Sequence, residues 1–186
     1  MENKELTLIK ACQNGDAQSF GHLYVYEKYF KKIYSFVYYR VSHKESTEDL
    51  VSLVFTKALE NISKFNKGNF SAWLYRIARN TVIDYYRTSK VTQDLDNMAE
   101  LHIDSQISEA MDHNIQIQEI QDKLNRLNET QRDIIIMRVW DGLSYKEIAQ
   151  IVGKSESNCK MIFSRGLKEL RLSMASLALL ITLLID

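Results

Sequence analysis

The sequence of 186 residues contains no proline and only six glycines, and this scarcity limits the folds open to the chain more than any other feature. Strand-rich sandwiches and barrels need many tight turns, which proline and glycine supply, whereas both residues disfavour the interior of a helix. Apolar side chains make up 45% of the chain, which is enough to fold around a hydrophobic core. The composition therefore predicts an all-α fold built from long helices.

Charge divides the chain into segments, although 24 basic and 24 acidic residues cancel over its whole length. Residues 89–118 contain one lysine and six acidic residues, and they lack aromatic side chains and a sustained helical pattern. We interpret this stretch as a flexible acidic linker. The sequence then predicts a first helical domain at residues 1–90, the linker at 91–118, a second helical domain at 119–173 and an apolar C-terminal helical extension at 174–186.

In the first domain, apolar residues recur at the three- and four-residue spacing of amphipathic helices. Leu50, Val54 and Ala58 form one such stripe. Ser46 is followed three residues later by Asp49, a pattern that satisfies free backbone amides at a helix N-terminus. We therefore predict that this helix begins at Ser46.

A third helix of the first domain, predicted over residues 70–87, combines positive charge with aromatic and amide side chains. Its predicted outward stripe consists of Arg76, Arg79, Asn80, Ile83 and Arg87, with Tyr75 and Tyr86 beside it. Cations bind phosphates, flat rings stack on unpaired bases and amides contact base edges, so this pattern is typical of a surface for single-stranded nucleic acid. The alternative is that the rings fill a core and the arginines form a solvated face.

The second domain contains the pattern of a helix-turn-helix over residues 143–170. Ser144 and Glu147 predict a capping box at the start of a short helix. Gly153 suits the turn after that helix, and Ser155 caps the longer helix that follows. A helix of this kind fits the major groove of duplex DNA, whereas the alternative is a plain helical hairpin with a solvated basic face. The predicted outer face of the longer helix carries Ser157, Lys160, Met161, Ser164, Arg165 and Lys168.

The sequence offers little for catalysis or metal binding. Its four histidines are scattered, and it has no HExxH motif, no glycine-rich phosphate loop and no GxSxG motif. Cys12 and Cys159 lie far apart without the spacing of a zinc site or a disulfide framework. The first ten residues alternate charged and apolar side chains, so no signal peptide is predicted. We expect a cytoplasmic protein that is not an enzyme and has no catalytic residues, metal or cofactor.

Taken together, the motifs of both domains resemble those of extracytoplasmic-function (ECF) RNA polymerase sigma factors, a compact bacterial class that retains only the second and fourth sigma domains. In the first domain the resemblance rests on Glu48-Asp49-Leu50-Val51, Val54-Phe55, Ala58, residues 70–80 and Asp84-Tyr85. In the second domain it rests on Leu127, Gln131-Arg132, Gly142-Leu143-Ser144-Tyr145, Glu147-Ile148-Ala149, Gly153, Ser155-Glu156, Lys160 and Ser164-Arg165-Gly166.

The resemblance implies a promoter-specificity subunit with core RNA polymerase, promoter DNA in duplex and single-stranded form, and an anti-sigma factor as partners. It implies that the largest-subunit clamp of the polymerase contacts Asp49, Leu50, Val54 and Phe55. The unpaired strand of the minus-ten element would contact Lys67, Gly68, Asn69, Arg76, Arg79, Asn80 and Arg87. The minus-thirty-five duplex would contact the outer face of the helix after Ser155, with Lys168 at its end.

Two features depart from the family pattern. Ser157-Asn158-Cys159 stands where the family has a small residue, Thr and Val, and Met161-Ile162 replaces a Ser-Arg pair, which removes a phosphate contact. The apolar segment 174–186 is too short to span a bilayer. It either packs on one of the domains or acts as an autoinhibitory latch, a dimer contact or a regulator-binding surface. For the whole chain, the alternatives are an autonomous helix-turn-helix regulator of duplex DNA and a helical interaction protein that does not bind DNA.

Overall fold

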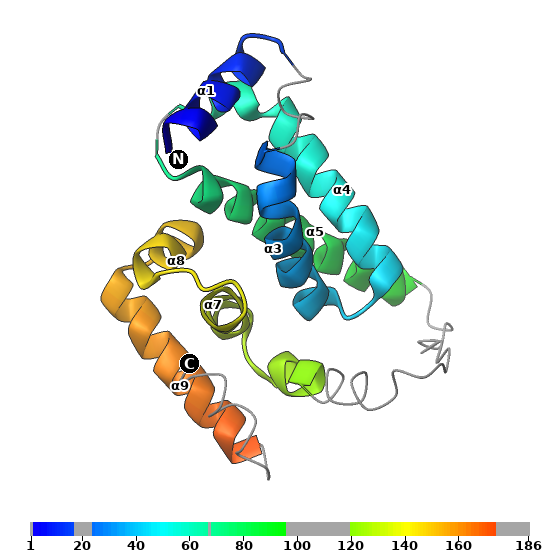
Figure 1. The fold of residues 1–186 in the computed structure, drawn as a ribbon. Helices are drawn as coiled ribbons and strands as arrows, with labels where there is room; N and C mark the ends of the chain where they lie inside the picture. Colours follow the sequence, from blue (N-terminus) through cyan, green and yellow to red (C-terminus); the bar gives the residue numbers. More distant parts are fainter. Residues whose placement is uncertain (1, 17–23, 67, 96–119, 174–186) are drawn as a thin grey trace, which may run out of the picture.

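A computed structural model of the chain describes residues 2–16, 24–66, 68–95 and 120–173, which form helices and turns without a β-strand (Figure 1). This confirms the predicted all-α class for the described residues. The first domain contains α1 (Glu2–Gln13), α3 (Tyr24–Val41), α4 (Lys44–Glu60), the short 3-10 helix η1 (Ile62–Lys64) and α5 (Phe70–Leu95). The second domain contains a helical segment at 120–126, followed by α7 (Glu129–Val139), α8 (Tyr145–Val152) and α9 (Glu156–Ser173).

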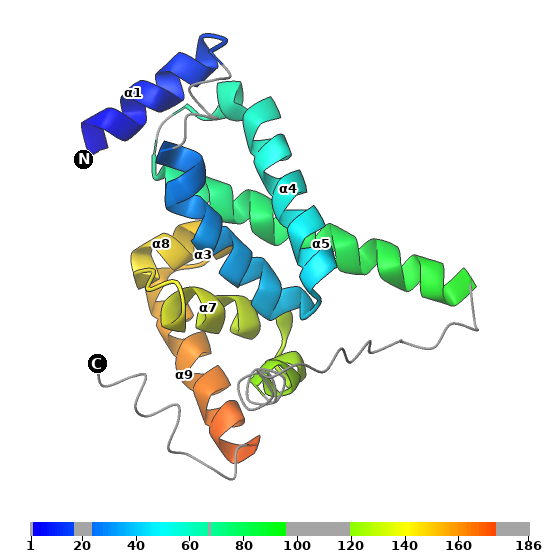
Figure 2. The same ribbon diagram turned by 45° about the vertical axis from the view of Figure 1, so that its right-hand side comes forward.

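The helices of the first domain pack around one apolar core. Helices α3, α4 and α5 each pack against the other two, and α1 lies near η1 at one end (Figures 1 and 2). The predicted stripe of α4 is buried as expected, with Leu50, Val54 and Ala58 all facing this core. Burying a side chain of this size stabilises the fold by about 1.5–3 kcal/mol, so the stripe fixes the face that α4 turns inward.

Two boundaries in the first domain differ from the prediction. Helix α4 begins at Lys44 rather than at Ser46, because the extended residue His43 is its N-cap and accepts a hydrogen bond from the Ser46 amide through Nδ1. Helix α5 continues to Leu95, so residues 91–95, assigned to the linker from the sequence, are helical. The remainder of the predicted linker, residues 96–118, lies outside the described residues.

The second domain begins each helix as its sequence predicts. Ser144 and Glu147 form a reciprocal capping box at the start of α8, and Gly153 ends that helix in the left-handed conformation, with φ 67°. The Ser155 hydroxyl accepts a hydrogen bond from the Asn158 amide at the start of α9. Gly166 allows α9 to approach α7, since a Cβ there would lie 2.8 Å from the Ile135 Cδ1 atom.

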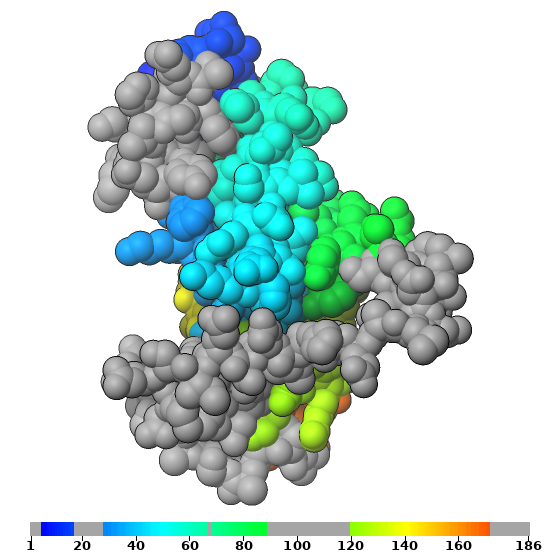
Figure 3. All heavy atoms as spheres, turned by 90° about the vertical axis from the view of Figure 1, so that its right-hand side faces the viewer, coloured from blue at the N-terminus to red at the C-terminus, as the bar shows by residue number. Residues whose placement is uncertain are grey.

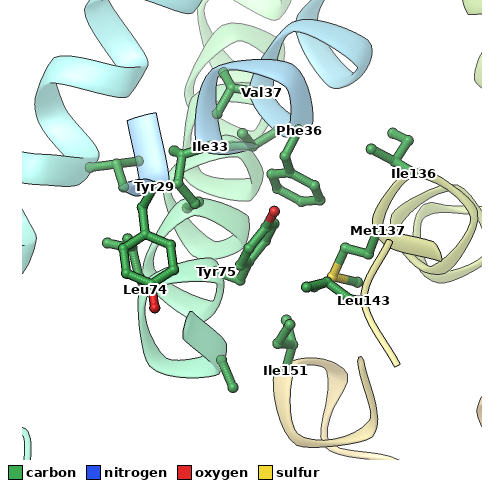
Figure 4. Close-up of a cluster of buried hydrophobic side chains, with 14 of the residues drawn as sticks. Tyr29, Ile33, Phe36, Val37, Leu74, Tyr75, Ile136, Met137, Leu143 and Ile151 are labelled. Atoms are coloured by element: carbon green, nitrogen blue, oxygen red, sulfur yellow. The ribbon is translucent and has the colours of Figure 1, made fainter. Parts of the chain in front are cut away.

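The two domains pack directly against each other. We call the contact of α3 and α5 with α7 and α8 the interdomain interface. Its apolar part continues the core of the first domain into the second, with Phe36 and Tyr75 on one side and Met137, Leu143 and Ile151 on the other (Figure 4). Tyr75 was predicted beside the outward stripe of its helix, and the structure corrects this: Tyr75 is fully buried because the second domain covers that face.

No helix within the described part of the chain is long and apolar enough to cross a membrane. The cysteines Cys12 and Cys159 are both buried with free thiols. The apolar segment 174–186 and the latch hypothesis attached to it fall outside the described residues.

Candidate nucleic-acid and polymerase-binding surfaces

The outer face of α9 is open to solvent along the length predicted for duplex DNA. We call this set of side chains the α9 face. Its members are all exposed, and they include one large apolar side chain, Met161, at 45%. The opposite side of α9 is held in the domain by Cys159 and Leu170, which are buried. The structure therefore confirms the predicted exposure of Ser157, Lys160, Met161, Ser164, Arg165 and Lys168.

Helix α8 is fixed relative to α9 by a small cluster around Tyr145. The Tyr145 ring packs edge-on against Phe163 of α9. The guanidinium of Arg138 lies 4.9 Å from the Tyr145 ring centre and donates a hydrogen bond to the Leu143 carbonyl. Because both helices of the motif are held by these contacts, α9 presents its outer face as a rigid element.

Lys160 is partly engaged within α9. Its Nζ lies 2.9 Å from a carboxylate oxygen of Glu156, one turn earlier on the same helix. Exposed pairs of this kind contribute about 0.3–0.5 kcal/mol, which a phosphate or a guanine edge exceeds easily. Lys160 is therefore available to a nucleic acid, and so is Arg165, which is also exposed.

A cleft of about 410 Å³ opens at the start of α5. We call it the α5 cleft. Asn69 shapes its edge, because its side-chain oxygen accepts a hydrogen bond from the Ala72 amide and caps the helix. The aromatic rings of Phe65 and Trp73 pack against each other in its wall, with ring centres 5.4 Å apart. The full lining is Lys64, Phe65, Asn66, Gly68, Asn69, Ala72, Trp73, Arg76 and Gln150.

The cleft brings together residues that the sequence placed in one surface for unpaired bases. Gly68, Asn69 and Arg76 line it, whereas Lys67 lies outside the described residues. Gln150 was not foreseen there, because it comes from α8 of the second domain. No pattern in the sequence indicates that a residue some 80 positions away would border this cleft.

The predicted outward stripe of α5 is only partly outward. Arg76, Asn80 and Arg87 are exposed, as expected. Arg79 is not, and this corrects the prediction: its side chain is 20% exposed, and its Nε lies 2.6 Å from the Asp133 carboxylate of α7. The second domain therefore covers Arg79, whereas Arg76, Asn80 and Arg87 stay exposed.

Asp133 lies at the centre of the charged part of the interdomain interface. It is fully buried, with Arg79 on one side and Nη1 of Arg40 3.2 Å from its other oxygen. Arg40 itself is only 3% exposed and also pairs with Glu129 at 3.2 Å. Burial raises the pKa of Asp133, and the guanidinium groups of Arg40 and Arg79 oppose this by stabilising the carboxylate. Sequence analysis assigned no role to Arg40 or Asp133.

A second carboxyl is buried in the same interface. Asp141 follows α7 and lies close to the Tyr75 hydroxyl of α5. Burial raises the pKa of Asp141 to about 7, since the nearby Tyr75 hydroxyl and Lys32 compensate only in part. One Asp141 carboxyl oxygen has no hydrogen-bond partner within the described residues. The interface therefore holds a carboxyl that titrates near neutral pH.

The outer side of α4 differs from the polymerase-binding set expected from the sequence. Asp49 is exposed, but Leu50, Val54 and Phe55 are buried in the core, so they cannot contact a partner directly. The exposed apolar side chain next to Asp49 is Leu53, at 42%. Figure 3 shows α4 on an open side of the molecule. Leu53 lies four residues after Asp49, so the two side chains share one outward face of α4.

The described residues contain no group of three or more histidine, cysteine, aspartate or glutamate side chains that could hold a metal ion. What they do contain is a basic, DNA-sized helix on a helix-turn-helix and an aromatic cleft beside arginine and asparagine. This combination defines a two-domain helical transcription protein.

Comparison with known proteins narrows this class. Residues 25–92 match the family model Sigma-70 region 2, and residues 117–170 match Sigma-70, region 4. Over 175 residues the chain is 30% identical to the ECF RNA polymerase sigma factor SigW of Bacillus subtilis, covering 88% of this chain and 92% of SigW. The chain belongs to the family of ECF RNA polymerase sigma factors. We refer to its domains as region 2 and region 4 from here on.

Two further proteins are similar. The ECF sigma factor BldN of Streptomyces coelicolor is 32% identical over 170 residues, and the match spans 89% of this chain and 64% of BldN. The solved structure of the sigma factor RpoE of Bartonella quintana, in complex with the anti-sigma factor NepR, matches with a TM-score of 0.63 and 26% identity over 81% of this chain and 96% of RpoE. Since both regions match sigma factors, the alternative of an autonomous helix-turn-helix regulator is not favoured.

Proposed function

We propose that this chain directs core RNA polymerase to its promoters by reading the minus-thirty-five duplex with the α9 face. The observation that carries this proposal is the row of six exposed side chains on one side of a rigid helix-turn-helix. Lysine and arginine offer cations to phosphates and hydrogen bonds to guanine, and serine contacts either. Met161 adds an apolar group that suits a thymine methyl.

The α5 cleft is proposed to receive an unpaired base of the minus-ten element. Pulling a base from the stack costs a few kcal/mol, which a pocket must offset. Phe65 and Trp73 supply ring surface, and Asn69 supplies amide groups at the rim. Arg76, Asn80 and Arg87 are exposed for the neighbouring backbone and bases. Arg79 joins this surface only when Asp133 releases it.

The exposed side of α4 is proposed to contact the clamp of the polymerase. Asp49 and Leu53 form the centre of this face, with Ser52 and Thr56 beside them. Leu50, Val54 and Phe55 contribute indirectly, since they anchor α4 in the core and fix the direction of the outer side chains. A carboxylate beside an exposed leucine is typical of an interface that has an apolar centre and a polar rim.

An anti-sigma factor is proposed as a further partner, on the support of the RpoE structure solved with NepR. The proposed role needs no chemistry by this chain: it binds and positions, while the polymerase catalyses RNA synthesis. We also propose a cytoplasmic location, because the polymerase and the promoter are found there.

The decisive experiment is transcription by purified core polymerase with this chain added. We expect promoter-dependent transcripts that need the sigma chain, and no transcripts with the core enzyme alone. Leu53→Lys should reduce affinity for the core enzyme by about tenfold, equivalent to about 1.4 kcal/mol. Leu6→Lys is the matched control, because Leu6 is similarly exposed, at 47%, but lies on α1 rather than on α4. Equal losses in both variants would refute the assignment of this face, and failure to bind core polymerase at all would refute the proposed function.

A further inference from the structure

Region 4 places a buried carboxylate on the arginine surface of region 2. Both oxygens of Asp133 face guanidinium groups, one from Arg79 of α5 at 2.6 Å and one from Arg40 of α3 at 3.2 Å. Arginine binds carboxylate and phosphate by the same fork of N–H donors. In this structure the carboxylate of Asp133 therefore satisfies Arg79 as a DNA phosphate would.

At the α5 cleft, too, donors of region 2 bind oxygen atoms of region 4. Arg76 donates a hydrogen bond of 2.9 Å to the backbone carbonyl of Gln150. The Asn69 side-chain amide donates to the Glu147 carboxylate at 3.3 Å. In both contacts a donor of region 2 meets an oxygen acceptor from α8 of region 4. Phosphate oxygens and base carbonyls are also acceptors, so each contact uses a donor that nucleic acid would use.

We propose that region 4 is an intramolecular competitor for the single-stranded DNA surface of region 2, with Asp133 occupying the position of a DNA phosphate. This inference rests on the proposed role of that surface in binding the minus-ten strand. The segment that closes the surface is α7 and α8, not the apolar extension at 174–186.

The apolar and the charged contacts of the interdomain interface affect closure in different ways. Apolar packing of Tyr75 against Met137, Leu143 and Ile151 favours closure without regard to charge. The carboxylate of Asp133 lowers the free-energy cost of burying Arg40 and Arg79 in the closed form, because guanidinium groups without a counter-ion are costly to bury. Opening would return Arg79 to water and to nucleic acid. The charge of Asp133 therefore sets the balance between the closed and open forms.

Closure affects the two DNA surfaces differently. The α9 face remains exposed in the closed form, including Lys160 and Arg165. The α5 surface is covered at Arg79 and bordered by Gln150 at the cleft. The closed protein should therefore discriminate against unpaired DNA while its upstream-reading helix stays free. Loss of Asp133 should change binding to single-stranded DNA and leave duplex binding unaltered.

The test compares Asp133→Asn with the wild-type chain. Asparagine has nearly the same shape, but it leaves Arg79 without its counter-charge and Arg40 with Glu129 alone. Asp122→Asn is the matched control, since it removes the same charge at an exposed position of region 4 that lies outside the interdomain interface and outside α5. Circular dichroism verifies that each variant keeps its helices. Small-angle scattering measures the radius of gyration, and fluorescence anisotropy measures affinity for a short fluorescein-labelled single-stranded DNA of mixed sequence.

We expect Asp133→Asn to increase the radius of gyration and to raise the affinity for single-stranded DNA by at least about tenfold, because losing one partner of a buried charge strongly disfavours the closed form. Adding Arg79→Ala to Asp133→Asn should remove that gain in affinity and leave the expansion. The Asp122→Asn control should behave as wild type. A folded Asp133→Asn protein that stays as compact as wild type would overturn the inference.

The two readouts separate this inference from the proposed function. Expansion with higher affinity that depends on Arg79 supports both. Expansion without any gain in affinity for single-stranded DNA overturns the role of the α5 surface in binding the unpaired strand, and with it the competition. Should Asp133→Asn lose its helices, Arg40→Gln provides the same test from the region 2 side, because it removes one of the two cations that face Asp133.

Discussion

The buried carboxyl of Asp141 makes the stability of this protein depend on pH in an unusual direction. Its pKa is raised from 3.8 to about 7, mainly by burial in the interdomain interface. The folded chain therefore holds a proton that the unfolded chain has already lost between these two values. Unfolding releases that proton, so the free energy of unfolding falls as pH rises across this window. Most carboxylates that form ion pairs in a folded protein have a lowered pKa, so their contribution to the free energy of unfolding rises with pH.

The size of the effect follows from the two pKa values. The difference between 3.8 and about 7 corresponds to about 4 kcal/mol, which is lost mostly between pH ~4 and pH ~7. Asp141→Asn keeps the shape of the side chain and removes its titration. We expect this variant to be more stable than wild type at pH ~8 and to lose that advantage as the pH falls toward ~4.

The assay is urea unfolding of both proteins followed by circular dichroism at several pH values. Subtracting the two free energies of unfolding isolates Asp141, because every other titrating group is common to both chains. Glu147 acts in the opposite direction in both proteins: burial raises its pKa, but hydrogen bonds from Ser144 and Asn69 and the charge of Lys32 together lower it below its usual value. A difference between the two proteins that stays constant across the pH range would refute the reasoning.

Other predictions concern the helices and surfaces of the proposed sites. Ser144→Ala removes half of the capping box of α8 and should lower the free energy of unfolding by about 1 kcal/mol, measured in urea. Lys160→Ala and Arg165→Ala should each weaken binding of a minus-thirty-five duplex by the polymerase holoenzyme, by about 1–3 kcal/mol where the side chain contacts a base. If Arg165 contacts only a phosphate, its loss should instead weaken all sequences alike and reduce the salt dependence of binding, with a slope lower by about 1. Asn80→Ala should slow promoter opening, followed by the reactivity of unpaired thymines, more than it weakens duplex binding, and equal effects on both steps would contradict the assignment.

Local patterns in the sequence predict the helices well because the interactions concerned are local. The caps predicted in region 4 connect residues three positions apart, and the structure confirms them at Ser144 and Ser155. The stripe of Leu50, Val54 and Ala58 is buried because residues four positions apart share one side of a helix. The exposed side of α9 follows from the same periodicity.

The residues predicted to bind the polymerase on α4 fall into a buried group and an exposed group. Leu50, Val54 and Phe55 belong to a recognisable family pattern, but a pattern records residues that hold the helix as well as residues that touch a partner. Burial separates the two sets, and only Asp49 of the predicted polymerase-binding residues is exposed. Helical spacing from Asp49 already pointed to Leu53.

The sequence by itself determined the all-helical class, the caps of α8 and α9 and which helix carries an open basic face, because each depends on composition or on neighbours within about one turn. The tertiary structure decided what happens to the middle of α5. Tyr75 and Arg79 look like surface residues along the chain, and they are covered because Asp133 and Met137 arrive from a helix more than 50 residues away. A contact between distant segments leaves no periodic trace in either of them, so only the packing of region 4 on region 2 shows that Arg79 of α5 is covered while the α9 face stays open.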